Sequence, residues 1–441
     1  MVMRKMIILW LSLIGAFLTV LDTGIVFTGT VKIAADLHLS AAQLSWVQLS
    51  YALTYAGFML LAGKLGDLYG RKKLFIIGLL IFGVGSLMIG ASNNAAMIIG
   101  FRAFQGIGAA IIQPTSLSII TDTFEDEELK KAIGYYSAVV GAGAAVGITV
   151  GGFFASFVSW RGGFFVNVPI ALIMILLAQK YLKNEERDVS RLDLIGSLLS
   201  VVAMGSLTYG IDGSSNPETV LLISAFLWIV FLISQKAVKN PMMPLLIFKS
   251  RERFGAYVGS LLFSAAGVIF WFYIPQFLQL KLGNNPFVAG LEMVPMSIFL
   301  FIVALQVRKV TKQIGNNAVM ILGLLLVLLS SIGLSLVSKS SSYLIILPFT
   351  LTFGFGFAFA LTPLTFSATN NLPKNVSGAA SGVYNTTRQF GAALGLALGT
   401  CFVGNLSDVS TIFKDVMNLA SVLSLMGILF VLVFVIRKKS K

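Results

Sequence analysis

Cysteine, histidine and charged residues are all scarce in this chain of 441 residues. Cys401 is the single cysteine, which excludes an intrachain disulfide and any metal cluster built on cysteine. His38 is the single histidine, and we expect it in a short solvated loop rather than in a proton relay. Charged residues make up only 11% of the chain, against about 25% in soluble proteins. Together with 57% hydrophobic residues, this predicts an all-α polytopic membrane protein surrounded by lipid bilayer.

The sequence also lacks the motifs of common enzyme classes. It contains no metal-ligand cluster, no Ser/His/Asp set and no phosphate-binding loop, so we expect no catalytic residue, no bound metal and no cofactor. The net charge of +14 would suggest a nucleic-acid partner if it were clustered in a soluble domain. The positive-inside rule for membrane proteins explains the distribution of these charges better, and we expect no nucleic-acid partner.

Fourteen segments are long and apolar enough to cross a hydrocarbon core of about 30 Å, which takes about 20 residues. They are residues 7–30, 43–62, 74–91, 97–120, 132–154, 164–182, 194–211, 219–238, 254–277, 286–307, 318–337, 343–366, 376–403 and 415–436. The N-terminus is basic and then apolar, like a signal peptide, but its long apolar run holds Asp22. We therefore expect a retained first helix.

The basic residues predict the orientation of these spans. An even number of spans places both termini on one side of the membrane. Arg102 and Arg388 fall inside spans, and the loops assigned to the outside hold only Lys32, Arg161, Lys281, Lys339 and Lys414. All other lysines and arginines fall on the side of the termini. The positive-inside rule therefore predicts that both termini are cytoplasmic.

The two ends of the sequence repeat one another. Span 132–154 matches span 376–403 at a fixed offset, with Ala132/Ala380, Gly143/Gly391, Gly147/Gly395 and Gly151/Gly399 among the identities. We predict two six-helix halves, residues 1–182 and 254–441, joined by a linker, residues 183–253, that adds a two-helix hairpin. Duplicated halves fit alternating access, in which one half rocks against the other around a central site. We expect the monomer to be the functional form.

A short glycine-punctuated basic stretch, residues 63–73, separates the second and third spans. Gly63, Gly66 and Gly70 permit the positive φ angles of a tight turn between helices. Asp67 is placed to cap the incoming helix, and Arg71 lies beside the membrane surface. The alternative is a loop that only keeps its positive charges in the cytoplasm.

Three ionisable residues in different spans are predicted to share one depth. At 1.5 Å per residue, Asp22, Arg102 and Glu292 each fall about 8 or 9 Å below the outer surface of the core. Each charge costs at least about 2.5–3.5 kcal/mol at the centre of a span, so it is retained for a reason. One interpretation is a static buried ion pair. The other is a proton site, where a carboxylate changes its proton affinity as Arg102 or water faces it.

A fourth charge and several aromatic residues are candidates for contact with substrate. Arg388 falls near the midplane, where it could hold an anionic group or pair with an acid. Cationic aromatic compounds stack on aromatic faces. The candidate lining of a central cavity is Trp46, Tyr51, Gln105, Trp271 and Tyr273.

Several stretches resemble signatures of the major facilitator superfamily, and in particular of its fourteen-span drug:proton antiporters. Residues 63–73 resemble the signature after the second span, and residues 143–152 resemble the fifth-span antiporter signature, with Ile148 replacing its proline. Leu21-Asp22 resembles the first-span motif, Arg102 to Gly108 the fourth-span motif, and Arg388-Gln389 the thirteenth-span motif.

The resemblance implies a major facilitator fold and a multidrug exporter of the bacterial cytoplasmic membrane, driven by the proton motive force. Its substrates would be amphiphilic small-molecule drugs, cationic or zwitterionic, exchanged for protons. It also implies that Arg71 pairs with Asp122 in the outward-open state and parts from it as the halves rock. The implied gating residues are Gly63, Asp67, Gly70, Arg71, Asp122, Gly143, Gly147, Gly151 and Gly152. The alternatives are a permease for one metabolite or a tetracycline-type exporter of a single drug class.

Overall fold

The computed structural model describes residues 2–183, 193–212, 215–238, 241, 243–337, 342–369, 374–403 and 408–436. All regular elements in these ranges are helical. The first are α1 (Val2–Leu37), α2 (Ala41–Tyr69), α3 (Arg71–Gly90), α4 (Ala95–Thr123), α5 (Asp126–Phe153), η1 (Phe154–Val158), α6 (Trp160–Phe165) and α7 (Asn167–Tyr181). Then follow α8 (Leu194–Asp212), α9 (Pro217–Ala237), η2 (Leu245–Lys249), α10 (Arg251–Leu280), α11 (Pro286–Ile314), α12 (Asn316–Ser335), α13 (Tyr343–Thr369), α14 (Lys374–Val403), α15 (Val409–Val431) and η3 (Leu432–Ile436).

Each predicted span coincides with a helix, although several helices extend further. The sixth predicted span is interrupted at Val166, between α6 and α7. Within the described residues, 10 helices are long and apolar enough to cross a membrane. The protein is therefore an all-helical multi-pass membrane protein, and the count of fourteen crossings remains a proposal.

Short polar residues begin several of these helices. Ser40 and Gln43 form a reciprocal capping box at the start of α2, and Asn94 caps α4 by accepting from the backbone N–H of Met97. Ser250 caps α10 in the same way, with a bond from Arg253. These caps satisfy backbone donors that would otherwise be exposed where a helix ends.

The junction between α2 and α3 differs from the predicted loop. α2 continues to Tyr69 and α3 begins at Arg71, so Gly70 alone, with φ 86°, makes the turn. Asp67 lies within the last turn of α2, and the N-cap position of α3 is occupied by Gly70, so the capping role expected of Asp67 stays a prediction. Gly63 is helical as well, and the side chain of Asp67 lies outside what the structure describes. Gly315, with φ 87°, makes the same turn between α11 and α12, which supports the internal repeat.

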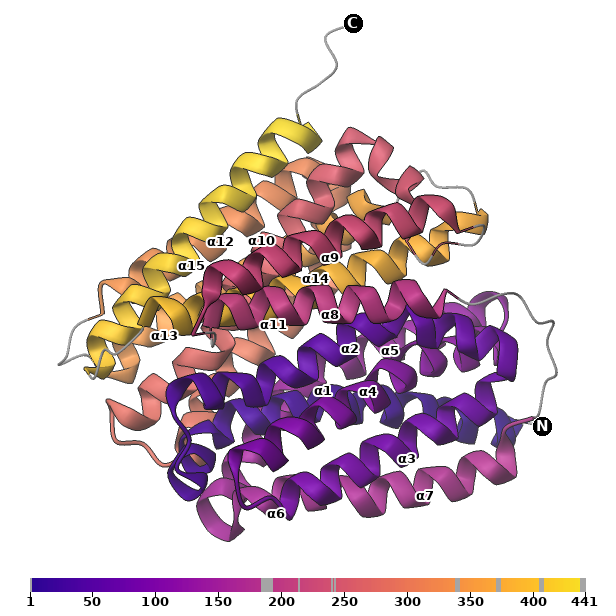
Figure 1. The fold of residues 1–441 in the computed structure, drawn as a ribbon, viewed down its shortest axis with the longest axis horizontal. Helices are drawn as coiled ribbons and strands as arrows, with labels where there is room; N and C mark the ends of the chain where they lie inside the picture. Colours follow the sequence, from indigo (N-terminus) through magenta and orange to yellow (C-terminus); the bar gives the residue numbers. More distant parts are fainter. Residues whose placement is uncertain are drawn as a thin grey trace, which may run out of the picture. The chain divides into compact units, whose positions relative to one another are not determined.

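The helices form two compact units (Figure 1). Unit 1 comprises Met1–Val201 with Asn285–Gly290, and unit 2 comprises Val202–Asn284 with Leu291–Lys441. In unit 1, α5 packs on α1 and α4 packs on α3; in unit 2, α14 packs on α10 and α13 packs on α12. Helices at matching places in the repeat thus pack in the same pairs, which confirms the repeat. The assignment of residues 183–253 as a linker remains a prediction.

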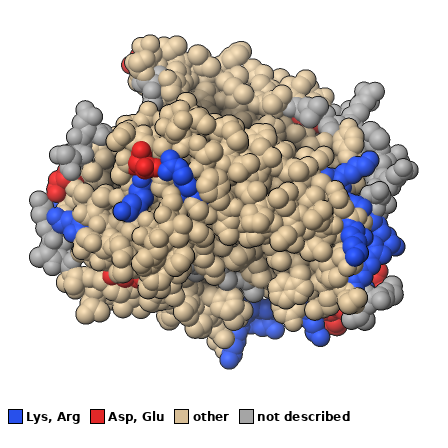
Figure 2. All heavy atoms as spheres, turned by 90° about the horizontal axis from the view of Figure 1, so that it is seen from below, with Lys and Arg blue, Asp and Glu red and all other residues tan. Residues whose placement is uncertain are grey.

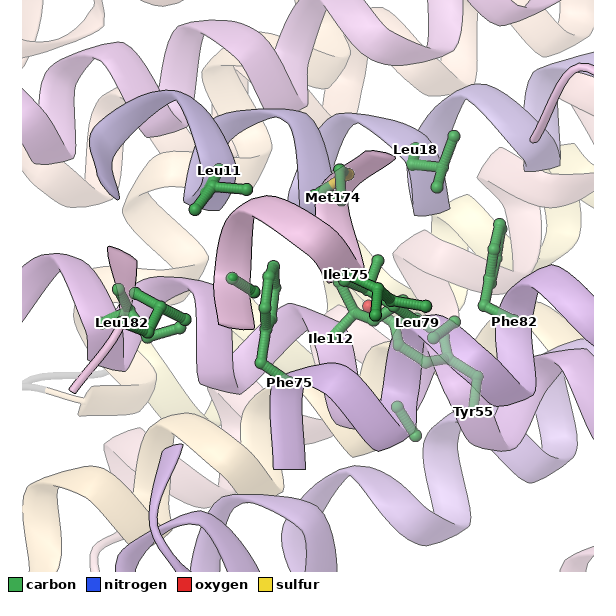
Figure 3. Close-up of a cluster of buried hydrophobic side chains, with 14 of the residues drawn as sticks. Leu11, Leu18, Tyr55, Phe75, Leu79, Phe82, Ile112, Met174, Ile175 and Leu182 are labelled. Atoms are coloured by element: carbon green, nitrogen blue, oxygen red, sulfur yellow. The ribbon is translucent and has the colours of Figure 1, made fainter. Parts of the chain in front are cut away.

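A cluster of apolar side chains joins five helices of unit 1 (Figure 3). Leu11 and Leu18 from α1 face Phe75 and Leu79 from α3, and Ile112 comes from α4. Tyr55 of α2 and Met174 and Ile175 of α7 belong to the same cluster. Phe75 and Leu79 are completely buried, so this packing fixes the helices that carry the site described next.

The outer surface carries few charges. On the face shown in Figure 2, lysine, arginine and acidic side chains gather in small groups separated by broad uncharged surface. Large apolar side chains are exposed along many helices, for example Leu222 and Phe226 of α9 and Leu176 of α7. A soluble protein rarely exposes so much contiguous apolar surface, whereas a lipid-facing protein does.

Candidate functional site: a buried ion pair in unit 1

The interior of unit 1 holds an ion pair between Asp22 of α1 and Arg102 of α4. Both side chains are 0% exposed, and Arg102 Nη1 donates to Asp22 Oδ2. Removing one partner of a buried ion pair strongly destabilises the folded protein, because the other charge is left uncompensated. The two residues that the sequence predicts at one depth are therefore in direct contact.

Helix α2 holds the other side of the Arg102 guanidinium. Arg102 Nε donates to the backbone oxygen of Val47 at 3.1 Å, and Nη2 donates to Gln48 Oε1 at 3.4 Å. The ring of Tyr51 lies 4.2 Å from the guanidinium carbon, within the range of a cation–π interaction. These contacts fix the position of the Arg102 guanidinium against α2.

Two amide side chains complete the environment of the Asp22 carboxylate. Its Oδ1 accepts from Gln105 Nε2 at 2.8 Å and from Asn167 Nδ2 at 3.0 Å. The same two amide nitrogens donate to Ser86 Oγ, at 2.7 and 3.3 Å. Gln105 Oε1 in turn accepts from Arg102 Nη1 at 2.6 Å. Three hydrogen-bond donors thus surround the Asp22 carboxylate: the Arg102 guanidinium and the amides of Gln105 and Asn167.

Glycines next to these residues allow the helices to approach. A Cβ at Gly106, which follows Gln105, would lie 2.5 Å from the backbone oxygen of Tyr51. A Cβ at Gly85, which precedes Ser86, would lie 2.8 Å from Cβ of Gln105. Both distances are shorter than real Cβ contacts allow. Only glycine at these positions lets α2, α3 and α4 meet around the ion pair.

The sequence identifies four of the seven residues whose side chains make up this network. It predicts Asp22 and Arg102 as charged site residues, and Gln105 and Tyr51 as the lining of a central cavity. In the structure, Gln105 and Tyr51 contact the ion pair. Sequence reasoning gives no role to the three neutral polar residues that complete the network: Gln48, Ser86 and Asn167. Asn167 begins α7 immediately after the break at Val166. The sequence offers two indications of it: an amide at a helix break inside an apolar run, and the resemblance of Asn167-Val168-Pro169 to the family's stretch before the sixth span.

The second copy of the repeat carries no equivalent pair. Gly147 of α5 faces the backbone oxygen of Leu21, and its counterpart Gly395 of α14 faces that of Ala265. The residue after Leu21 is Asp22, but the residue after Ala265 is Ala266. Gln105 precedes Gly106 in α4, whereas Phe353 precedes Gly354 at the matching place in α13.

Phe353 stacks on Phe270 of α10 with ring centroids 3.6 Å apart, so aromatic packing in unit 2 replaces the polar network of unit 1. The candidate cavity residue Trp271 lies beside this stack, with its ring edge-on to both phenylalanines. Tyr273 is 8% exposed and Trp46 is partly buried. Their role as a cavity lining stays a prediction.

Glu292 of α11 lies in unit 2 and has neutral partners. Its Oε2 accepts from Asn284 Nδ2 at 2.7 Å, and its backbone oxygen accepts from the Tyr343 hydroxyl at 2.7 Å. Within the described ranges, no lysine or arginine forms an ion pair with this carboxylate. Whether Glu292 shares a site with Asp22 stays a prediction.

Arg388 of α14 also lies in unit 2. Its Nε atom is buried and has no hydrogen-bond partner among the described residues. No acidic residue of the described part of the protein pairs with its guanidinium. The alternative that Arg388 binds an anionic group is therefore still open.

The ion pair that the resemblance implies between Arg71 and Asp122 is present, while its side of the membrane and its gating role stay predictions. Arg71 Nε lies 2.6 Å from Asp122 Oδ2, and the two side chains are 15% and 27% exposed. This pair joins the first turn of α3 to the last turn of α4.

The predicted glycine face of α5 packs directly on α1. A Cβ at Gly143 would lie 3.1 Å from Val20, and one at Gly151 would lie 2.5 Å from Cα of Ile25. A Cβ at Gly152 would lie 2.5 Å from the backbone oxygen of Pro286, which belongs to unit 1. Gly391 and Gly395 repeat this close packing between α14 and α10, against Leu261 and Ala265.

Comparison with known proteins agrees with this fold. The family model of the Major Facilitator Superfamily matches residues 12–396. The cephamycin export protein of Amycolatopsis lactamdurans is 32% identical over 87% of this chain and 82% of its own. The multidrug resistance protein Stp of Mycobacterium tuberculosis is 32% identical over 89% of this chain and 75% of its own. The crystal structure of a D-xylose–proton symporter has the same fold, with a TM-score of 0.74 over 99% of both chains and 15% identity.

These observations define a multi-pass helical transporter. The chain belongs to the major facilitator superfamily. The resemblance to this superfamily that the sequence motifs carry is thereby confirmed.

Proposed function

We propose that this protein exports amphiphilic drugs across the bacterial cytoplasmic membrane in exchange for protons, by alternating access. The observation that carries the proposal is the completely buried pair of Asp22 and Arg102, an ionisable acid and its counter-charge inside the membrane. Relatives that export cephamycin or confer multidrug resistance support drug efflux. The pair belongs to unit 1 alone, so we assign proton binding to unit 1.

In this proposal, Arg102 controls the proton affinity of Asp22. The carboxylate is ionised while the guanidinium faces it, and it takes up a proton when rearrangement of the helices separates the two. One proton that crosses about 100 mV supplies about 2.3 kcal/mol, enough for a little over tenfold accumulation of substrate. The proton motive force alone drives the cycle, without a cofactor.

We also propose a topology for the chain and a gate formed by an ion pair on the cytoplasmic side. Fourteen spans place both termini in the cytoplasm, residues 183–253 link two six-helix halves, and the monomer is the working form. The pair of Arg71 and Asp122 closes the cytoplasmic side in one state and separates in the other. Gly63, Asp67 and Gly70 form the rest of that gate, and the glycine face of α5 transmits the motion.

Charged and aromatic residues of unit 2 set the substrate class. Glu292 attracts a cationic group, because its carboxylate has only neutral partners in the described residues. Arg388 holds an anionic group with its guanidinium, whose Nε atom is buried and has no partner among the described residues. Together they favour cationic and zwitterionic drugs with an aromatic portion that stacks beside Trp271.

The test uses everted vesicles with an acidic interior and a pH-sensitive dye. An exporter that exchanges drug for protons dissipates the pH gradient when drug is added, in a saturable manner. A panel of cationic, zwitterionic, neutral and anionic compounds identifies the substrate class, and vesicles without the protein are the control. A response to one drug class alone would indicate a single-class exporter. No response to any drug, with a response to a metabolite, would contradict the proposal in favour of a permease.

A further inference from the structure

Asn167 is the one residue of the buried network with an unpaired polar atom. It is 0% exposed, its Nδ2 donates to Asp22 Oδ1 at 3.0 Å and to Ser86 Oγ at 3.3 Å, and its Oδ1 has no partner among the described residues. A buried carbonyl oxygen without a donor destabilises the folded protein, because it has lost its hydrogen bonds to water. Such an atom beside a carboxylate needs an explanation.

The antiport cycle proposed above, on which this inference rests, requires Asp22 to carry a proton in one state. Protonation converts one carboxylate oxygen from an acceptor into an O–H donor, and that donor needs a buried acceptor. Ser86 Oγ already accepts from both amides, and Gln105 Oε1 accepts from Arg102 at 2.6 Å. Gln105 and Arg102 are three residues apart on α4, so in this cycle their bond persists when the guanidinium parts from Asp22, and Asn167 Oδ1 is the acceptor of the network that remains.

We propose that the Asn167 amide turns over when Asp22 takes up a proton, so that Oδ1 accepts the new O–H. A half-turn about the Cβ–Cγ bond exchanges Oδ1 and Nδ2 within nearly the same volume. The hydroxyl of Ser86 then donates to Oδ1 instead of accepting from Nδ2. After the turn Oδ1 has partners and Nδ2 has none, so the number of unpaired polar atoms stays the same. The proton comes from a hydronium ion, which leaves as water, and it binds Asp22 Oδ1 while Arg102 keeps its charge.

Gln105 cannot make the same turn. Its Nε2 donates to Asp22 at 2.8 Å and to Ser86 at 2.7 Å, while its Oε1 accepts from the Arg102 guanidinium at 2.6 Å. A turned Gln105 would point an N–H at the guanidinium. The geometry therefore gives the two amides different roles: Gln105 fixes the ion pair, and Asn167 is the positioning residue for the protonated acid.

Infrared difference spectra between acidic and neutral pH, recorded on the reconstituted protein, test this directly. The wild-type protein is expected to show a carboxylic-acid C=O band together with a shift of the amide C=O band of an asparagine. The double variant Asp22→Asn/Arg102→Gln, which leaves no unpaired buried charge, should lose both signals. Asn167→Leu should lose the amide signal alone. An acid band without the amide shift overturns this inference but not the proposed function. Absence of the acid band overturns both.

Transport assays distinguish an acceptor role of Asn167 from a role in packing alone. Asn167→Leu keeps a similar volume but offers no acceptor, so drug-driven proton release should fall about tenfold, with equilibrium drug binding within about twofold of wild type. Asn167→Ser offers a hydroxyl that both donates and accepts, and should keep release within about threefold. Equal losses in the two variants, or unchanged release in Asn167→Leu, would overturn the inference.

Discussion

Gly147 of α5 lies directly against the backbone oxygen of Leu21 in α1, the residue that precedes Asp22. A Cβ built on Gly147 would fall within 3.0 Å of that oxygen, closer than real Cβ atoms approach. The packing of α5 therefore determines where the backbone of α1 runs beside the ion pair. Any larger residue at Gly147 must move α1 and the carboxylate with it.

This relationship predicts a graded series of substitutions. Gly147→Ala should destabilise the protein by about 1–3 kcal/mol and reduce transport, because overpacking must shift backbone rather than a flexible side chain. Gly147→Leu should abolish transport or folding. Gly134→Ala is the matched control, since Gly134 lies in the same helix with nothing within 4 Å of its built Cβ. The measurements are the thermal midpoint of the purified protein and drug efflux. Full activity of Gly147→Leu would contradict the packing.

The ion pair of Arg71 and Asp122 predicts a gating defect. Arg71→Ala or Asp122→Ala should slow transport about tenfold, the effect of about 1.4 kcal/mol on a barrier, because the pair stabilises one of the two states. Equilibrium drug affinity should stay within about twofold, since neither residue contacts drug in this proposal. Asp67→Ala is expected to behave in the same way.

Lys73→Ala controls for the loss of positive charge from the same turn, because its side chain is exposed. Efflux rates and drug binding are measured on the same preparations. A large loss of drug affinity in Arg71→Ala, or an equal loss of rate in Lys73→Ala, would argue against a gate.

Glu292 predicts a charge-selective defect. Glu292→Gln should weaken the binding of cationic substrates about tenfold and leave the affinity for neutral ones within about twofold of wild type. Only a cation is attracted by the carboxylate charge. Glu218→Gln removes an equal charge from the exposed start of α9 and is the control. Competition binding with a matched cationic and neutral pair gives the ratio. Equal losses for both compounds would make Glu292 a structural residue.

The fold was accessible from the sequence because hydrocarbon imposes strict rules on it. A span needs about 20 apolar residues, and charges inside one are so costly that the few present had to be meaningful. Asp22 and Arg102 could therefore be placed at one depth, and the structure joins them. The repeat was visible because Gly147 and Gly395 each face a backbone, where no larger residue fits.

Other features give no such signal. Gln48, Ser86 and Asn167 are neutral, so they cost little in a span and no pattern shows which way they face. The stretch from Gly63 to Lys73 looks like a loop from its glycines, but all of it except Gly70 is helical. Glycine permits a turn without requiring one, and tertiary packing decided where the turn occurs.

The last prediction concerns the ion pair itself. Asp22→Asn alone should abolish drug-driven proton release for every substrate, but it also leaves Arg102 buried without a counter-charge, at a cost of about 3–5 kcal/mol. Loss of folding and loss of coupling would then look alike. The double variant Asp22→Asn/Arg102→Gln removes both charges and should recover most of the thermal stability. If Asp22 binds the transported proton, the double variant still binds drug but no longer dissipates a pH gradient in everted vesicles. If the pair is only structural, the double variant both folds and couples, and the proton site lies elsewhere.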